Sequence, residues 1–159
     1  MNRRQEADAT LLAAPIGFVR NEVQGPGVRD WSQVVSEIVV EPRFEEALDG
    51  LEEYSHIFVL FWMHRSPAGE CIAMKTHPQM RADLPLVGVF ATRSPVRPNP
   101  VGMTIVSLIE RDGNVLRVKG LDAFDGTPVI DLKGFFPGDS IKDARVPDWV
   151  HKLRGGRDK

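Results

Sequence analysis

The segment Ala91–Gly102 (ATRSPVRPNPVG) concentrates groups that can bind an anion in one stiff stretch of chain. It contains three prolines, no acid, and the side chains of Arg93, Arg97 and Asn99. Each proline restricts the unfolded chain, which is worth roughly 0.4–1 kcal/mol where the native backbone suits it. The fork of an arginine binds a carboxylate or a phosphate through two parallel hydrogen bonds. The pattern therefore predicts a rigid loop that aims its arginines at an anionic ligand.

The downstream segment 121–133 (LDAFDGTPVIDLK) contains three aspartates around a tight turn. Acids in turns usually serve the backbone, which is a sufficient reason for Asp125. Asp131 falls in the middle of a strand pattern, where acids are depleted, so it is expected at a sheet edge or in an ion pair. A purely structural alternative for the arginine loop is that its arginines pair with Asp122 or Asp125.

Two further clusters are candidates for a site. His64 and Arg65 end the most apolar strand pattern, where a strand would lead into a loop that borders a site. The segment 25–31 (GPGVRDW) is a glycine-rich loop that ends in Trp31. This tryptophan is either a core residue or a stacking platform for a base or a cation.

Other common chemistries lack their motifs. His64, Cys71 and His77 do not have the spacing of paired metal ligands, so we expect no metal site and disfavour a metal hydrolase. The sequence has no nucleophile elbow, Walker loop or glycine-rich dinucleotide motif. A Rossmann-type nucleotide enzyme is therefore disfavoured as well.

Strand patterns dominate the chain. The predicted strands are residues 15–20, 34–40, 54–64, 84–91, 101–110, 114–120 and 129–133. The segment 54–64 is continuously apolar, which is typical of a strand buried on both faces. Short helices are predicted at 42–50 and 147–153. Many short strands separated by turns predict an all-β protein with minor helices, in the form of a single β-barrel-like domain.

The boundaries follow from these patterns. We expect a disordered leader at 1–14, the barrel domain at 15–137, and a short extension at 138–159 that is partly helical and then disordered. The aperiodic segment 65–83 is predicted to be a long excursion that covers or borders a site. The segment from His64 to Arg97 contains five Lys or Arg residues and two acids, although the whole chain of 159 residues has a net charge of −2. Any anion site is therefore a local patch.

The compartment is predicted from cysteine use and apolar runs. The single cysteine excludes an internal disulfide and suits a reducing compartment. No apolar run reaches the ~20 residues of a membrane-spanning helix. The apolar part of the N-terminus is too short for a signal peptide. We therefore expect a cytoplasmic protein that does not enter a membrane.

From Pro15 to about Phe136, the sequence resembles the TsaA-like family of TrmO-type tRNA adenosine N6-methyltransferases. Four stretches together carry the resemblance: PIGFVR, LEEYSHIFVLFWMHRS, GVFATRSPVRPNPVGMTIVSL and LDAFDGTPVIDLK. The resemblance implies a non-Rossmann, single-barrel methyltransferase that uses S-adenosylmethionine. It implies a homodimer with the cofactor site near the subunit interface. The implied substrate is the threonylcarbamoyl-modified adenosine next to the anticodon of tRNA.

The resemblance also implies site residues, which are carried over by motif match. The implied cofactor contacts are Arg29, Asp30, Trp31, His64, Arg65, Arg93, Met103, Leu121, Asp122, Ala123 and Phe124. Arg97 and Asn99 belong to the same motif and are expected to face an anionic substrate. At 28–31 this chain has VRDW, whereas family members carry a Pro-Arg-Gln-type loop. An adenine amine must lose a proton on methylation, and Asp122 or Asp131 could accept it.

The chemistry of the cofactor agrees with these residue types. S-adenosylmethionine offers a carboxylate for an arginine, an adenine for stacking on Trp31 or Phe124, and a sulfonium for aromatic faces or carboxylates. Two rival interpretations remain at this level. One is a non-catalytic β-barrel that binds RNA or a nucleotide, and the other is a methyltransferase that acts on a different small-molecule or nucleic-acid amine.

Overall fold

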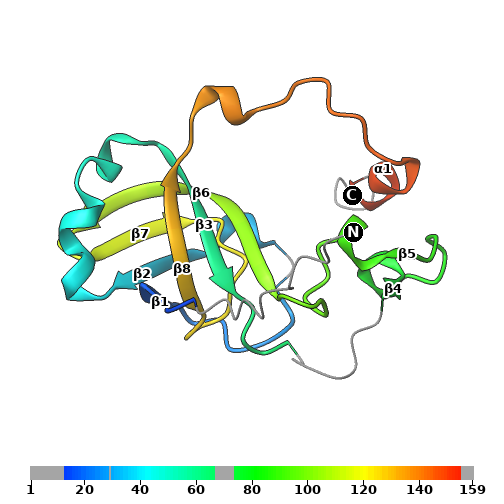
Figure 1. Ribbon diagram of the computed structural model, residues 1–159, viewed down its shortest axis with the longest axis horizontal. Coiled ribbons are helices and arrows are strands. Elements are labelled where there is room, and N and C mark those ends of the chain that lie inside the picture. Colours follow the sequence, from blue (N-terminus) through cyan, green and yellow to red (C-terminus); the bar gives the residue numbers. More distant parts are fainter. Residues whose placement is uncertain (1–12, 29, 67–73, 155–159) are drawn as a thin grey trace, which may run out of the picture.

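Six antiparallel strands close into a barrel in the computed structural model, which describes residues 13–28, 30–66 and 74–154 (Figure 1). The strands are β1 (Gly17–Arg20), β2 (Val35–Val40), β3 (His56–Trp62), β6 (Val101–Asp112), β7 (Val115–Lys119) and β8 (Pro128–Gly134). Their order around the barrel is β1-β2-β7-β6-β3-β8. The predicted all-β barrel class is confirmed.

The barrel interior is filled by alternate side chains of the strands, as the period of two along a strand requires. The core contains Val19, Ile38, Val59, Val106, Leu116, Val118 and Val129. Ile57 and Phe61 of β3 are also buried, but Phe58 and Leu60 on the other face of β3 are only half-buried. The prediction that this strand is buried on both faces was therefore wrong, because a closed barrel covers one face of each strand.

The predicted strand at 84–91 is a second difference. Only β5 (Val87–Gly88) is extended there, and it pairs with β4 (Lys75–Thr76) in a two-stranded sheet outside the barrel (Figure 1). The chain then turns into a 3-10 helix, η5 (Val89–Ala91). The hydroxyl and the N–H of Thr92 both donate to the carbonyl of Val89, at 2.8 and 3.1 Å. These local bonds outweigh the strand propensity of the sequence.

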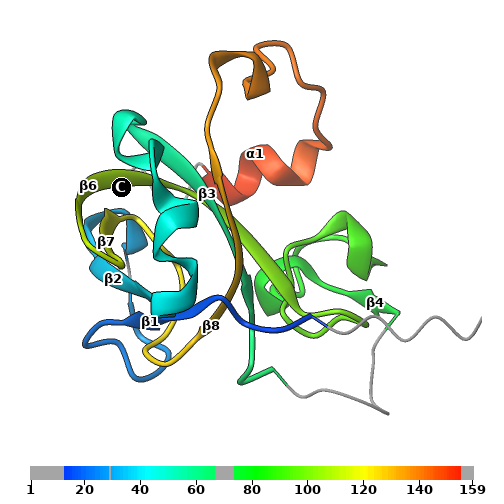
Figure 2. The ribbon, with the colours of Figure 1, turned by 60° about the vertical axis from the view of Figure 1, so that its left-hand side comes forward.

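The helical segments are short. The predicted helix at 42–50 is the 3-10 helix η2 (Pro42–Leu48), and Gly50 (φ 83°) links it to η3 (Leu51–Glu53). The remaining 3-10 helices are η1 (Trp31–Gln33), η4 (Pro78–Met80) and η6 (Pro137–Asp139). The α-helix α1 (Asp148–Arg154) follows a long connection after β8, as both ribbon views show (Figure 2). Within the described residues, no helix is long and apolar enough to cross a membrane.

Gly102 packs where a side chain does not fit. It lies opposite Phe61 in the β3–β6 ladder, and a Cβ at this position would overlap the ring of Phe61, which is 3% exposed. We expect Gly102→Ala to lower the free energy of unfolding by about 1–3 kcal/mol, because a filled core must shift to accept an added atom. Urea unfolding measures this change.

The matched control is Gly88→Ala, because a Cβ at Gly88 meets no atom within 4 Å. This variant is expected to unfold within about 0.5 kcal/mol of the original chain. An equal loss of stability for the two variants would contradict the steric explanation.

Candidate functional site

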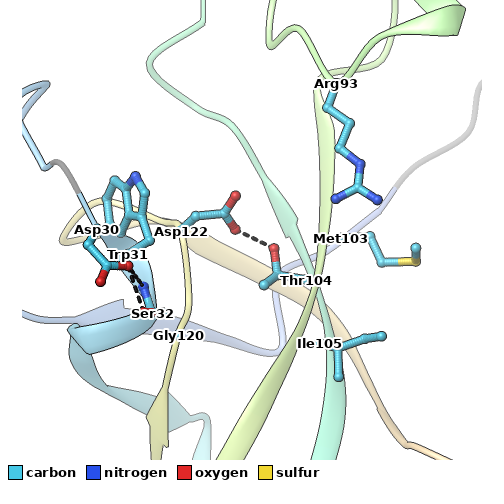
Figure 3. Close-up of a pocket in the computed structure, with 9 residues that line it drawn as sticks. All are labelled: Asp30, Trp31, Ser32, Arg93, Met103, Thr104, Ile105, Gly120 and Asp122. Atoms are coloured by element: carbon cyan, nitrogen blue, oxygen red, sulfur yellow. Dashed lines mark hydrogen bonds between the residues drawn. The ribbon is translucent and has the colours of Figure 1, made fainter. Parts of the chain in front are cut away.

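A hollow of about 590 Å³ opens beside β6, where the segments before β2 and after β7 meet it (Figure 3). Its lining residues are Asp30, Trp31, Ser32, Arg93, Met103, Thr104, Ile105, Gly120 and Asp122. They come from four separate parts of the sequence. The volume lies within the ~300–1,000 Å³ typical of small-molecule sites.

One wall is built at the start of η1. The carboxylate of Asp30 accepts hydrogen bonds from the hydroxyl of Ser32 at 2.6 Å and from its N–H at 2.9 Å. Both hydrogen bonds lower the pKa of Asp30 below its ordinary value, and the bond from the Ser32 hydroxyl has the larger effect. The cap starts the 3-10 turn that carries Trp31. An ionised carboxylate and an indole ring therefore sit side by side on this wall.

Two side chains from distant segments, Phe124 and Arg65, extend this wall beyond the lining of the hollow. The ring of Phe124 lies 5.9 Å from that of Trp31 in a tilted arrangement. The guanidinium of Arg65 lies over the ring of Phe124, 5.4 Å from its centroid. Arg65 also donates hydrogen bonds to the carbonyls of Gln24 and Asp125. These contacts give the tryptophan a fixed neighbour.

The segment Leu121–Phe124 alternates between the core and the site. Leu121 and Ala123 are 0% and 4% exposed and belong to the barrel core. Asp122 lines the hollow, and Phe124 packs beside Trp31. Of the four predicted cofactor contacts in this segment, only Asp122 therefore lines the hollow, and Phe124 contacts its wall through Trp31. Neither Leu121 nor Ala123 lines the hollow.

Asn21 holds this segment in place and was missed at the level of sequence. Its side-chain amide donates to the hydroxyl of the buried Ser36 at 2.9 Å and to the carbonyl of Ala123 at 3.0 Å. Its backbone N–H donates to the carboxylate of Asp125 at 3.0 Å, which is the main reason that the pKa of Asp125 lies below its ordinary value. Nothing in the local pattern marks Asn21, because its partners are far away in sequence.

Arg93 extends into the hollow from the segment after η5 (Figure 3). In the described part of the chain, neither Arg93 nor Arg97 forms an ion pair. Asp122 bonds to Thr104 instead, and Asp125 bonds to Asn21. The structural alternative, in which these aspartates pair with the arginines, is therefore not what the structure contains.

The proline-rich loop, residues 91–102, is hydrogen-bonded to the chain that follows β3. The hydroxyl of Ser66 donates to the carbonyl of Pro95 at 2.6 Å, and the N–H of Met63 donates to the carbonyl of Pro100 at 2.8 Å. This places the chain at His64 next to the loop, although His64 is not among the residues that line the hollow. Arg97 and Asn99 also lie outside the lining.

The two proposed proton acceptors are in different places. Asp122 lines the hollow. Asp131 is a residue of β8 that lies opposite Leu60 of β3, and its carboxylate forms an ion pair with the ammonium of Lys133 at an N–O distance of 2.6 Å. The ion-pair interpretation of Asp131 is thus the one that the structure contains. Arg29 and Cys71 lie outside the described residues. Within those residues, no group of three His, Cys, Asp or Glu could hold a metal ion.

The hollow combines one cation with two carboxylates and apolar surface. Arg93 faces a site that also contains Asp30 and Asp122, together with Trp31 and Met103 (Figure 3). An arginine fork suits a ligand carboxylate, an indole face suits a planar ring, and a carboxylate suits a ligand cation. The site therefore fits a small molecule that carries all three groups.

The fold and the hollow define a small closed β-barrel domain with a ligand site at its surface. Residues 23–139 match the family model described as the tRNA-methyltransferase O N-terminal domain. This chain belongs to that family, and the resemblance seen in its sequence is confirmed.

Relatives in three organisms show how far the similarity extends. Two are named "Probable S-adenosyl-L-methionine-binding protein". The one from Archaeoglobus fulgidus is 41% identical over 82% of this chain and 36% of its own length. The one from Methanothermobacter thermautotrophicus is 42% identical over 82% and 93%. The tRNA (adenine(37)-N6)-methyltransferase of Escherichia coli is 40% identical over 62% and 44%.

A solved structure agrees with the fold. The crystal structure of TrmO from Pseudomonas aeruginosa superposes with a TM-score of 0.73 at 30% identity, over 91% of this chain and 64% of that one. This chain thus spans about a third of the Archaeoglobus fulgidus relative and less than two thirds of the crystallised TrmO.

Proposed function

We propose that this protein is an S-adenosylmethionine-dependent methyltransferase that acts on N6 of the threonylcarbamoyl-modified adenosine next to the anticodon of tRNA. The observation that carries the proposal is the hollow in which Arg93, Asp122 and Trp31 come together. The names of the relatives support both halves of the proposal, because two are named for S-adenosylmethionine binding and one for methylation of tRNA adenine.

The residues at the hollow fit this cofactor. Arg93 would take its carboxylate, and Trp31 with Phe124 would flank its adenine. Asp30 and Asp122 supply negative charge for its sulfonium, and Met103 supplies apolar surface. Once bound, the cofactor provides an activated methyl group.

The protein's own contribution to the reaction is alignment and proton transfer. Holding the two reactants in line can supply about 7–11 kcal/mol of the barrier. The walls of the hollow are fixed by the Asp30 cap and the Asn21 bonds, which suits this task. Two carboxylates line the hollow, and Asp30 already accepts two hydrogen bonds from Ser32. We therefore assign to Asp122 the proton that leaves the adenine N6 as the new N–C bond forms.

The tRNA is assigned to the proline-rich loop beside the hollow. Arg97 and Asn99 stand in a stretch tied to β3 by the Ser66 and Met63 bonds, so their backbone is held in place before any ligand binds. Arginine and amide groups suit phosphates and the carboxylate of a threonylcarbamoyl group.

A homodimer in the cytoplasm completes the proposal. Four apolar side chains on β6 are between 37% and 57% exposed: Val101, Met103, Ile105 and Ile109. Met103 and Ile105 also line the hollow, so a second copy that covers β6 would border the cofactor site. An exposed apolar stripe of this kind is typical of an interface.

The dimer has its own test. We expect Ile109→Glu to shift the molar mass measured by light scattering from dimer toward monomer, because a charge would be buried in the interface. Val35→Glu is the matched control, because Val35 is 43% exposed on β2. An original chain that is monomeric at all concentrations contradicts the dimer.

The function is tested by calorimetric titration of S-adenosylmethionine, followed by transfer of a labelled methyl group to tRNA with and without the threonylcarbamoyl group. We expect micromolar binding and label in the modified tRNA only. Binding without transfer to either tRNA would favour a different amine as the acceptor. Salt-dependent tRNA binding without any cofactor binding would favour the non-catalytic RNA-binding barrel.

A further inference from the structure

Thr104 makes a contact inside the hollow that the proposed function does not use. Its hydroxyl donates a hydrogen bond to a carboxylate oxygen of Asp122, which is 18 positions away in the chain (Figure 3). Thr104 is half-buried on β6, opposite Val59 of β3. It shares the inward side of β6 with Gly102 and the buried Val106. On this side of β6, Thr104 therefore carries a hydroxyl that bonds to a residue of the hollow.

The bond accounts for the orientation of Asp122. In the described segments, no other hydrogen bond and no ion pair is recorded for this carboxylate, although Arg93 lines the same hollow. A hydrogen bond to an ionised group is stronger than one between neutral groups and holds its geometry better. One oxygen of Asp122 is thus engaged by Thr104, and the other remains available to a ligand.

We propose that Thr104 is a positioning residue, whose hydroxyl fixes the carboxylate of Asp122 in the direction needed to accept a proton from the substrate. This inference rests on the proposed function. Thr104 itself touches no reacting atom, because it acts through Asp122. A loose carboxylate would spend part of its time in unproductive orientations, and misplacement of a catalytic group by about 1 Å is enough to slow a reaction strongly.

The test compares Thr104→Val, which keeps the shape and removes the hydroxyl, with Thr104→Ser, which keeps the hydroxyl. We expect valine to lower kcat for methyl transfer roughly 10- to 100-fold, as for loss of a hydrogen bond to a charged group. The Kd for S-adenosylmethionine should change by a smaller factor than kcat, since Arg93 and Trp31, the groups assigned to its carboxylate and adenine, are untouched. Serine should restore kcat to within about threefold of the original chain.

A double-mutant cycle separates positioning from structure. In an Asp122→Asn background, Thr104→Val should lower kcat by less than about twofold, because the carboxylate that it positions is gone. Equal losses for valine and serine, or the full valine loss in the Asp122→Asn background, would overturn the inference. An original chain that binds no S-adenosylmethionine, or transfers no methyl group, overturns the proposed function and removes the ground for this inference with it.

Discussion

Replacing Arg93 by alanine is expected to weaken the binding of S-adenosylmethionine roughly 10- to 100-fold, because hydrogen bonds to charged groups are worth ~1.5–3 kcal/mol each. Arg93 lines the hollow, and no ion pair within the described chain neutralises it. Its substitution should therefore leave the fold intact and remove the group assigned to the ligand carboxylate. Calorimetric titration measures the Kd, and thermal unfolding checks that the variant is folded.

The control for Arg93 comes from the same loop. Arg97 does not line the hollow, so Arg97→Ala should bind S-adenosylmethionine within about twofold of the original chain. Its effect is expected on the KM for tRNA instead. If Arg93→Ala kept its affinity for the cofactor, the prediction that this rigid loop aims Arg93 at an anionic group of the ligand would be wrong. If both variants lost affinity equally, the effect would come from the net charge of the loop.

Asp122→Asn is expected to lower kcat for methyl transfer about 10²- to 10⁴-fold, the usual contribution of a positioned proton acceptor. Asparagine has nearly the same shape and can still accept the hydrogen bond of Thr104, but it cannot take a proton at neutral pH. Single-turnover kinetics with the modified tRNA measures the chemical step, and titration of the cofactor shows how much binding is lost.

Asp131→Asn tests the alternative acceptor. Asp131 is paired with Lys133 on the outer surface of β8, at 43% exposure of its side chain, and it does not line the hollow. Its substitution should change kcat by less than about threefold, since exposed ion pairs contribute little. A large loss for Asp131→Asn together with a small one for Asp122→Asn would reverse the assignment of the two aspartates.

The barrel was predictable because its elements are encoded locally. In strands β2 and β7, buried residues alternate with less buried ones, and Asp112–Gly113 marks the turn between β6 and β7. Segment 84–91 was mistaken for a barrel strand because its residues have strand propensity. The bonds from Thr92 to Val89 that turn the chain there depend on a loop conformation that residue types alone do not encode.

The site was predictable in part. Arg93, Trp31 and Asp122 were identified by residue type and by the family motif, and the fold brings them to one hollow. Ser32 and Thr104 line the same hollow and were missed. Their roles arise from single hydrogen bonds to Asp30 and Asp122, and a lone hydroxyl residue has no pattern that marks such a bond.

The sequence by itself determined the fold class, the family and the kinds of groups present, because residue type sets hydrophobic periodicity, charge and hydrogen-bonding capacity. Only the tertiary structure decided which of these groups meet. In the sequence, Asp122 and Asp131 are two aspartates nine positions apart that residue type does not distinguish. Closure of the barrel turns one toward Thr104 and the hollow and leaves the other beside Lys133. Leu121 and Ala123, on either side of Asp122, belong to the core of the closed barrel.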